Sequence, residues 1–170
     1  MKLRQRLHFS ATSLADIDGR ATPGAPGDKA KTSAAAVEQA GQFAQLQERL
    51  YAEGTQPGAS RRVLLILQGM DTSGKGGTIE HVIGAINPQG AQIASFKKPT
   101  EEERRHHFLW RIRGQIPAPG RIGVFDRSHY EDVLIARVRA LAAPEEIERR
   151  YAAINRFEDK LVGDGVAVIR

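Results

Sequence analysis

A glycine-rich segment directly after a buried strand constrains this chain more than any other feature. Val63–Gln68 is a short, largely apolar run rich in branched residues, which predicts a strand buried on both faces. The next eight residues, Gly69–Gly76, read Gly-Met-Asp-Thr-Ser-Gly-Lys-Gly, and a helical pattern follows them. A strand, G-x-x-x-x-G-K and a helix in this order indicate a phosphate-binding loop. The chain should therefore fold around a parallel sheet with this loop at its carboxyl edge.

The residue types of this segment suit contact with phosphate. Glycines allow backbone N–H groups to converge on an anion, and the start of the following helix adds a partial positive charge. We expect Lys75 to supply a full charge to the phosphoryl group that is transferred. The residues expected to contact phosphate around it are Gly69, Thr72, Ser73, Gly74, Gly76, Gly77 and Thr78. The alternative is an accidental glycine-rich turn.

Two aspartates are the candidate metal ligands. The loop has Gly76 where the motif usually places the Ser or Thr that binds Mg²⁺, so another group must hold the metal. Asp71 lies inside the loop, and Asp126 ends a predicted strand, Ile122–Asp126, whose end should share the crevice with the loop. We predict that both bind Mg²⁺, with Mn²⁺ as an alternative ion. Asp71 could instead stabilise the turn, and Asp126 could cap the next helix.

The positive charge of the chain is concentrated in its middle. Residues 61–139 contain 13 Lys and Arg but 8 Asp and Glu, whereas the remaining residues are balanced. A local basic field attracts polyanions, although a merely solvated basic face is the alternative. We expect Arg127 to clamp phosphate oxygens beside Asp126. Residues expected to add phosphate or nucleotide contacts are Lys97, Arg111, Arg113, Arg121 and Glu131.

The order of predicted elements indicates an α/β fold with a mainly parallel sheet. Strands and helices alternate along the chain. We expect a flexible N-terminal segment over residues 1–33 and one folded core over 34–170. The other predicted helices and strands are a helix over Ala34–Glu53, a helix over Thr78–Ile86, a strand over Ala91–Phe96, a helix from Thr100 to about Gly114, a helix over Tyr130–Leu141, a helix from Pro144, and a strand over Val166–Arg170.

Composition excludes several functional classes. The chain has no cysteine, which excludes disulfides, cysteine-based zinc sites and thiol nucleophiles. It contains no apolar run of about 18 residues and no apolar segment after its basic N-terminus, so we expect a cytoplasmic protein without membrane contact. Aromatic residues do not alternate with the basic ones, which makes nucleic acid an unfavourable partner.

Long contiguous motifs resemble family-2 polyphosphate kinases. They are LLILQGMDTSGKGGTI, VIGAINPQGAQIASFKKPT, HFLWRIRGQIPAPGRIGVFDRSHYEDVL and the upstream LQERLYAEG. The resemblance implies a thymidylate-kinase-like P-loop fold, a three-layer sandwich. It also implies Mg²⁺-dependent phosphoryl transfer between inorganic polyphosphate and nucleoside mono- or diphosphates, in a homo-oligomer. By this resemblance Asp71 and Asp126 are metal ligands, Lys75 binds the phosphoryl group in flight, and Arg127 and Lys97 bind phosphate.

The resemblance also sets an expectation about the end of the chain. Members of the family usually continue past Val166–Arg170 with a basic lid helix and further sheet elements. We therefore expect a sheet that is incomplete on its C-terminal side, and a catalytic floor without the lid that excludes water. Two alternatives to the polyphosphate-dependent enzyme stay open. One is an ATP-dependent kinase of another small substrate, and the other is a non-catalytic polyanion-binding fragment.

Overall fold

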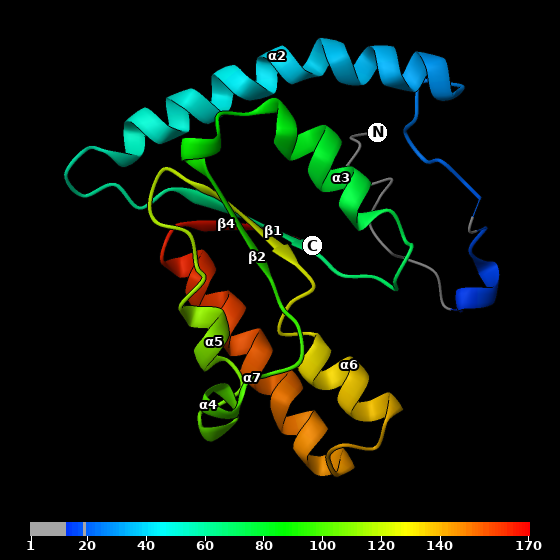
Figure 1. Ribbon diagram of the computed structural model, residues 1–170, viewed down its shortest axis with the longest axis vertical. Helices are drawn as coiled ribbons and strands as arrows, with labels where there is room; N and C mark the ends of the chain where they lie inside the picture. Colours follow the sequence, from blue (N-terminus) through cyan, green and yellow to red (C-terminus); the bar gives the residue numbers. More distant parts are fainter. Residues whose placement is uncertain (1–12, 19) are drawn as a thin grey trace. The chain divides into compact units, whose positions relative to one another are not determined.

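The computed structural model describes residues 13–18 and 20–170 of the chain (Figure 1). It divides into two compact units, one ending at Gly41 and one over Gln42–Arg170. The predicted flexible segment 1–33 includes residues 1–12 and 19, which lie outside the described residues. That prediction stays a prediction.

The described residues form α-helices, short 3₁₀ helices (η) and strands. None of the described helices combines the length and apolar character needed to cross a bilayer. In chain order the elements are η1 (Leu14–Asp16), α2 (Lys29–Gly54), β1 (Arg62–Leu67), α3 (Lys75–Val82), η2 (Ile83–Ala85), η3 (Pro88–Gly90), β2 (Ala91–Ser95), α4 (Glu101–Arg105), α5 (Trp110–Arg113), β3 (Ile122–Asp126), α6 (Glu131–Val138), α7 (Pro144–Gly163) and β4 (Val166–Ile169).

The first long helix begins earlier than predicted, at Lys29 rather than Ala34. Asp28 explains the difference because its side chain caps the helix. Its Oδ1 accepts a hydrogen bond from the backbone N–H of Lys31 at 2.9 Å, and its carbonyl accepts from the hydroxyl of Thr32 at 2.9 Å. A capping aspartate therefore starts the helix inside the segment 1–33 that was predicted to be flexible.

The single helix predicted from Thr100 to about Gly114 is also wrong. The structure has two short helices, α4 and α5, because the backbone becomes extended at His106. The start is as expected, since Thr100 and Glu103 form a reciprocal capping box. The break between the helices lets the chain turn and bury Leu109 and Ile112 in the core.

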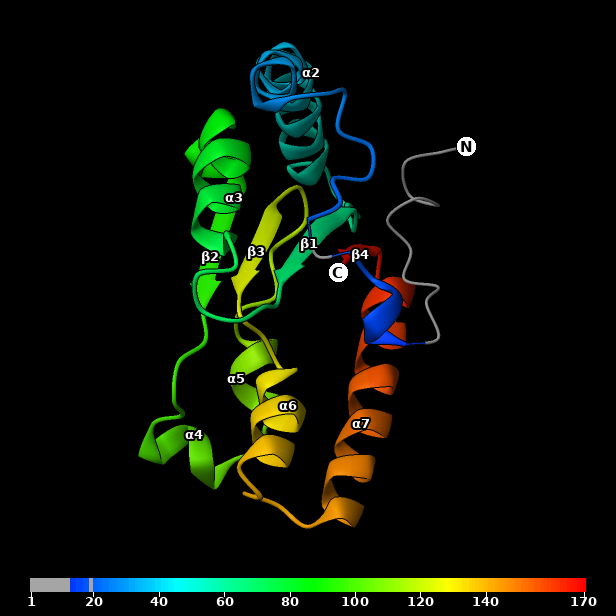
Figure 2. The same ribbon diagram turned by 90° about the vertical axis from the view of Figure 1, so that its right-hand side faces the viewer.

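The sheet has four parallel strands in the order β2-β3-β1-β4, which Figure 2 shows from side to side. The all-parallel order confirms the predicted α/β class. Asp126 at the end of β3 pairs in register with Leu67 of β1 and with Ser95 of β2. Three strands therefore end together, and the segments that follow them start from one edge of the sheet.

Apolar side chains cover both faces of this sheet. Leu64 and Ile66 of β1 belong to one buried cluster, together with side chains of α5, α6 and α7. Their neighbours Val63 and Leu65 pack against a second cluster that includes Phe43 of α2 and Ile83. Figure 1 shows α3 and α7 on opposite sides of the strands. The alternation of side chains along β1 thus produces the three predicted layers.

A close backbone contact within the second unit gives a test of the packing. A Cβ atom added to Gly54, the last residue of α2, would lie 2.3 Å from the Cα of Gly120. We expect Gly54→Ala to lower the free energy of unfolding by about 1–3 kcal/mol, because neither backbone can move away cheaply. Urea denaturation measures this change.

Gly41 in the same helix is the matched control. An added Cβ there meets no atom within 4 Å, and alanine is the better helix former. Gly41→Ala should therefore leave the midpoint of unfolding unchanged or raise it. Equal stability of Gly54→Ala and the unmodified protein would contradict the close packing of this helix end.

Candidate functional site

The glycine-rich loop joins β1 to α3 and presents backbone N–H groups. Gly74 has φ 87° and precedes α3, whose start carries no side-chain cap. An added Cβ on Gly74, Gly76 or Gly77 would meet no atom within 4 Å, so packing within the protein does not require glycine there. The left-handed backbone of Gly74 favours glycine by itself, whereas close approach of a ligand to the backbone gives a reason for Gly76 and Gly77. Gly69 differs, because a Cβ there would lie 2.7 Å from the Oγ of Ser73.

The loop and the end of β3 line one pocket. It has a volume of about 420 Å³, and its lining residues are Asp71, Thr72, Ser73, Gly74, Lys75, Gly76, Asp126 and Arg127. β1 and β3 are neighbours in the sheet, so the segments that follow them face each other. The structure therefore brings the four predicted catalytic residues together, although they come from segments more than fifty positions apart.

Both cations of this pocket make hydrogen bonds within the protein, Arg127 to a carboxylate and Lys75 to backbone carbonyls. Arg127 Nη2 donates to Asp71 Oδ1 at 2.7 Å, and Lys75 Nζ donates to the carbonyls of Gly69 and Met70 at 2.9 and 2.8 Å. The hydrogen bond that Arg127 donates to Asp71, followed by the negative charge of that carboxylate, raises the pKa of Arg127, which therefore stays a cation. The side chain of Asp71 is 82 % exposed, so an incoming ligand can reach this pair.

The oxygen atoms in the pocket suit a hard divalent cation. Asp71 and Asp126 both line it, and Asp126 Oδ2 accepts from the hydroxyl of Ser95 at 3.4 Å. Within residues 13–18 and 20–170 no cluster of three or more His, Asp or Glu side chains could hold a metal. Mg²⁺ usually binds through one or two carboxylates and takes its other ligands from water and substrate phosphates. The two aspartates fit that mode of binding.

Gln68 is a residue of this region that the sequence reasoning missed. Its side-chain Nε2 donates to Glu131 Oε1 at 2.7 Å, and its Oε1 accepts from the hydroxyl of Ser128 at 3.0 Å. The only signal in the sequence was a polar residue at the end of a buried strand. Glu131, which was predicted to contact nucleotide or phosphate, accepts this hydrogen bond from Gln68, and its contact with a ligand stays a prediction. The hydroxyl of Thr78 donates to the carbonyl of Gly74 at 3.2 Å.

Four basic residues expected to contact phosphate or nucleotide, Lys97, Arg111, Arg113 and Arg121, do not line this pocket. Lys97 is exposed at the same edge of the sheet, where its carbonyl accepts from Arg111 Nη1 at 2.8 Å. Arg113 lies over the ring of Phe157 in α7, at 5.9 Å from the ring centre. Arg121 immediately precedes β3, so it lies at the amino edge of the sheet, opposite to the loop. The structure thus separates Arg113 and Arg121 from the loop pocket.

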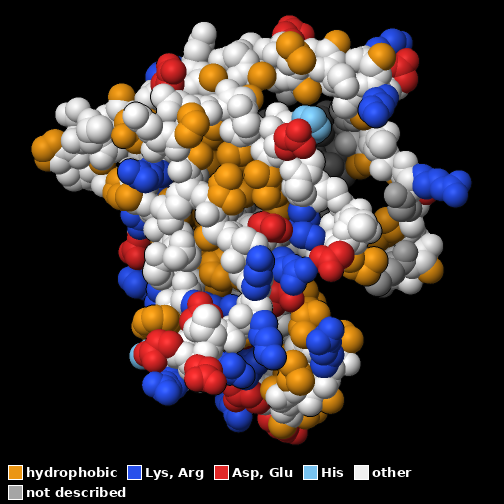
Figure 3. Space-filling model, in the orientation of Figure 1, with side chains coloured by type: hydrophobic (Ala, Val, Ile, Leu, Met, Phe, Trp, Pro, Cys, Tyr) orange, Lys and Arg blue, Asp and Glu red, His pale blue; other side chains and the backbone are white. Residues whose placement is uncertain are grey.

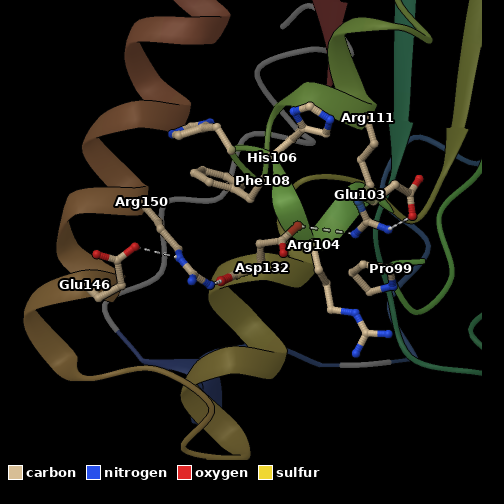
Figure 4. A pocket seen from close by; sticks show the side chains of 10 residues that line it. Pro99, Glu103, Arg104, His106, Phe108, Arg111, Asp132, Glu146 and Arg150 are labelled. Carbon is tan, nitrogen blue, oxygen red and sulfur yellow. Dashed lines mark hydrogen bonds and ion pairs between the residues drawn. The ribbon is translucent and has the colours of Figure 1, made fainter. Parts of the chain in front are cut away.

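A second pocket of about 310 Å³ lies between α4, α6 and α7 (Figure 4). Figure 3 shows Lys and Arg side chains gathered over the half of the molecule where these helices lie, with acidic side chains among them. Asp132 lies between two arginines there: its Oδ2 accepts from Arg111 at 3.4 Å and its carbonyl from Arg150 at 2.9 Å. Arg150 also bonds to Glu146 at 3.2 Å. These arginines are balanced by carboxylates rather than free to bind a polyanion.

Comparison with known protein families shows to which family the chain belongs. A family described as "Polyphosphate kinase 2 (PPK2)" matches residues 27–170. The chain belongs to the polyphosphate kinase 2 family. The match begins two residues before α2, and it includes the loop, Asp126 and the last strand.

Individual relatives agree with this PPK2 assignment. An "AMP/ADP-polyphosphate phosphotransferase" of Meiothermus ruber is 44% identical over 125 residues, which are 74% of this chain and 45% of that protein. An "ADP-polyphosphate phosphotransferase" of Rhodopseudomonas palustris is 42% identical over 137 residues, 74% of this chain and 46% of that protein. The crystal structure of polyphosphate kinase 2 from Arthrobacter aurescens TC1 matches with a TM-score of 0.91 and 53% identity, over 96% of this chain and 57% of that one. The chain thus spans about half the length of the curated relatives, and the likeness confirms the predicted P-loop kinase-like fold.

One histidine of this PPK2 chain, two residues after Arg127 in the sequence, is buried against α7. His129 is fully buried, and its Nε2 lies 3.0 Å from Glu158 Oε1, which also accepts from the hydroxyl of Tyr130 at 2.7 Å. Burial, followed by the positive charge of Arg170, outweighs the charge of Asp132 and lowers the pKa of His129 to about 4. The ring is therefore neutral at pH 7. Among the described residues Nδ1 finds no hydrogen-bond partner, which places the hydrogen on Nε2 as the donor to Glu158.

The neutral buried ring of His129 predicts a loss of stability in mild acid. An unfolded chain takes up this proton near pH 6.5, whereas the folded protein does so only near pH 4. The contribution is complete above pH 6.5 and is lost as the pH falls toward 4, by up to about 3 kcal/mol. Urea denaturation at a series of pH values should show a shallower decline for His129→Gln. The exposed His81 provides the control, and an equal change in His81→Gln would contradict the assignment.

Proposed function

We propose that this chain carries the catalytic floor for Mg²⁺-dependent phosphoryl transfer between inorganic polyphosphate and nucleoside mono- or diphosphates. The observation that carries the proposal is the meeting of Asp71, Lys75, Asp126 and Arg127 in one pocket at an uncapped helix start. Membership of the PPK2 family and the printed names of the M. ruber and R. palustris relatives support polyphosphate and AMP or ADP as the substrates.

In this proposal an oxygen of the nucleotide's terminal phosphate attacks the terminal phosphorus of polyphosphate. The bridging P–O bond breaks, and the polyphosphate leaves one unit shorter. The reverse reaction uses the same contacts. No side chain has to act as a nucleophile, so the protein contributes position and charge.

Each residue of the pocket has a separate task. The ammonium group of Lys75 leaves the loop carbonyls and follows the phosphoryl group during transfer, while the N–H groups at the start of α3 hold its oxygens. Arg127 offers two parallel N–H donors to a neighbouring phosphate. Asp71 and Asp126 would hold Mg²⁺ or Mn²⁺, which neutralises charge on phosphate oxygens when bound.

The test supplies one phosphoryl donor at a time. The protein is incubated with Mg²⁺ and AMP or ADP, and with either polyphosphate or ATP as donor. Chromatography of the nucleotides then identifies the products. The proposal expects ADP from AMP, or ATP from ADP, in the polyphosphate arms, and no reaction without divalent cation.

Two results would reject the proposal in favour of the alternatives. Transfer from ATP to another small acceptor, with polyphosphate inert, would identify an ATP-dependent kinase. Salt-sensitive binding of polyphosphate without any transfer would identify a polyanion-binding module.

A further inference from the structure

The side-chain amide of Gln68 joins the two loops that carry the pocket. Gln68 is the residue directly before the phosphate-binding loop. Its Nε2 donates to Glu131 at the start of α6, and its Oε1 accepts from Ser128 in the segment after β3. Because the amide donates on one side and accepts on the other, both partners fix its orientation.

The segment after β3, which Gln68 contacts through Ser128 and Glu131, makes few other hydrogen bonds to β1. The N–H of Arg127 donates to the carbonyl of Leu67 at 3.0 Å. Among the described residues this is the last backbone hydrogen bond, in chain order, that the segment after β3 makes to β1. Arg127 itself has φ 63°, a left-handed conformation that costs a side-chain-bearing residue about 1–3 kcal/mol and persists only where the surrounding structure imposes it. The next residue, Ser128, is fully buried, and its Oγ also accepts from the N–H of Tyr130 at 3.2 Å. Gln68 is thus connected through Ser128 to the backbone directly after the strained residue, while the strand pairing of Leu67 with Asp126 fixes the backbone before it.

We propose that Gln68 is a positioning residue that holds Arg127 and Asp126 in register with the phosphate-binding loop through Ser128 and Glu131. Its place at the end of β1 suits this role because any movement of the loop start is transmitted directly to the segment after β3. The expected effect of Gln68 on catalysis rests on the proposed function of the pocket. Its effect on the position of the segment after β3 does not depend on that function.

Exchanging the Gln and Glu side chains at positions 68 and 131 tests this hydrogen bond while keeping side chains of the same size at both positions. Gln68→Glu places two carboxylates against each other and should release the segment. The double variant Gln68→Glu with Glu131→Gln exchanges the two side chains. The amide at position 131 can then donate to the carboxylate at position 68, and this carboxylate can still accept from the hydroxyl of Ser128. Each effect of Gln68→Glu is measured in the unmodified protein and in the Glu131→Gln background. Any direct contact of the Glu131 carboxylate with a substrate cancels in this comparison.

Exchange of the Tyr130 amide hydrogen, followed by NMR, reports on the segment without any substrate. We expect Gln68→Glu to speed this exchange about tenfold in the unmodified protein and less than about threefold in the Glu131→Gln background, a coupling typical of one hydrogen-bond network. In the phosphotransferase assay kcat should follow the same pattern, with a loss of about tenfold that the second substitution suppresses. Gln56→Glu, which adds the same charge at an exposed turn, should change neither quantity.

Two outcomes would overturn the proposal. One is unchanged exchange at Tyr130 in Gln68→Glu, and the other is an equal loss of kcat from Gln68→Glu in both backgrounds. If the unmodified protein transfers no phosphate from polyphosphate, the proposed function fails. The exchange measurement still decides whether Gln68 positions the segment.

Discussion

Replacing Lys75 with alanine should abolish phosphoryl transfer from polyphosphate to ADP, with a loss of kcat of at least about 10³-fold. The ammonium group carries a full positive charge at the first residue of α3, where in the proposed function the oxygens of the transferred group gain charge in the transition state. Its bonds to the carbonyls of Gly69 and Met70 are to uncharged acceptors, so it can leave them for phosphate. Steady-state kinetics with chromatographic detection of ATP measures the loss.

Lys160→Ala is the matched control for this experiment. Lys160 is an exposed lysine of α7 whose partner, Asp164, is one turn away on the same surface. Its replacement should leave kcat within about twofold, because an exposed ion pair contributes little. A Lys75→Ala protein that keeps more than a tenth of the original kcat would remove Lys75 from the chemistry.

Asp126→Asn should reduce both metal binding and catalysis. The substitution keeps the size and one oxygen of the side chain but removes the charge that attracts Mg²⁺, so we expect kcat at saturating Mg²⁺ to fall about 10²-fold or more. The concentration of Mg²⁺ or Mn²⁺ required for half-maximal activity should rise at the same time. Isothermal titration of Mn²⁺ in the presence of a non-reacting nucleotide measures the loss of affinity without turnover.

An exposed aspartate on α7 shows whether this effect is specific. Asp159→Asn makes the same chemical change far from the loop in the sequence, and it should alter neither kcat nor the Mn²⁺ isotherm. If Asp126→Asn bound Mn²⁺ as tightly as the unmodified protein, the carboxylate would be a helix-capping or structural group. The metal would then have to be held by Asp71 and the substrate.

Local patterns predicted most of the fold. The run of branched residues over Val63–Leu67, the glycine-rich loop and Ile122–Asp126 each became the expected element, and parallel pairing followed from their alternation with helices. The errors were at helix boundaries. Asp28 starts a helix through one side chain, and the extended His106 divides another so that Leu109 can be buried. Such boundaries depend on tertiary packing, which a periodic pattern does not contain.

The part of the candidate site that lies at the carboxyl ends of strands could be predicted from the sequence. Asp71 and Asp126 meet because parallel neighbours carry their following segments to one edge. The basic residues were less predictable, because an arginine looks the same in sequence whether it binds a ligand or the protein. Arg111 is almost fully buried beside Asp132, and Arg121 lies at the opposite edge of the sheet. The role of Gln68 depends on partners about sixty residues away, which sequence spacing alone does not pair.

The bond between Arg127 and Asp71 makes the affinities for cation and anion depend on each other. A cation that draws Asp71 away frees the guanidinium for phosphate, and a phosphate that takes Arg127 frees the carboxylate for a cation. Each ligand therefore removes a competitor of the other, and linkage requires the two effects to be equal in size. If the pocket has the function proposed above, it would discriminate against either ion alone and favour a metal that arrives together with its phosphate chain.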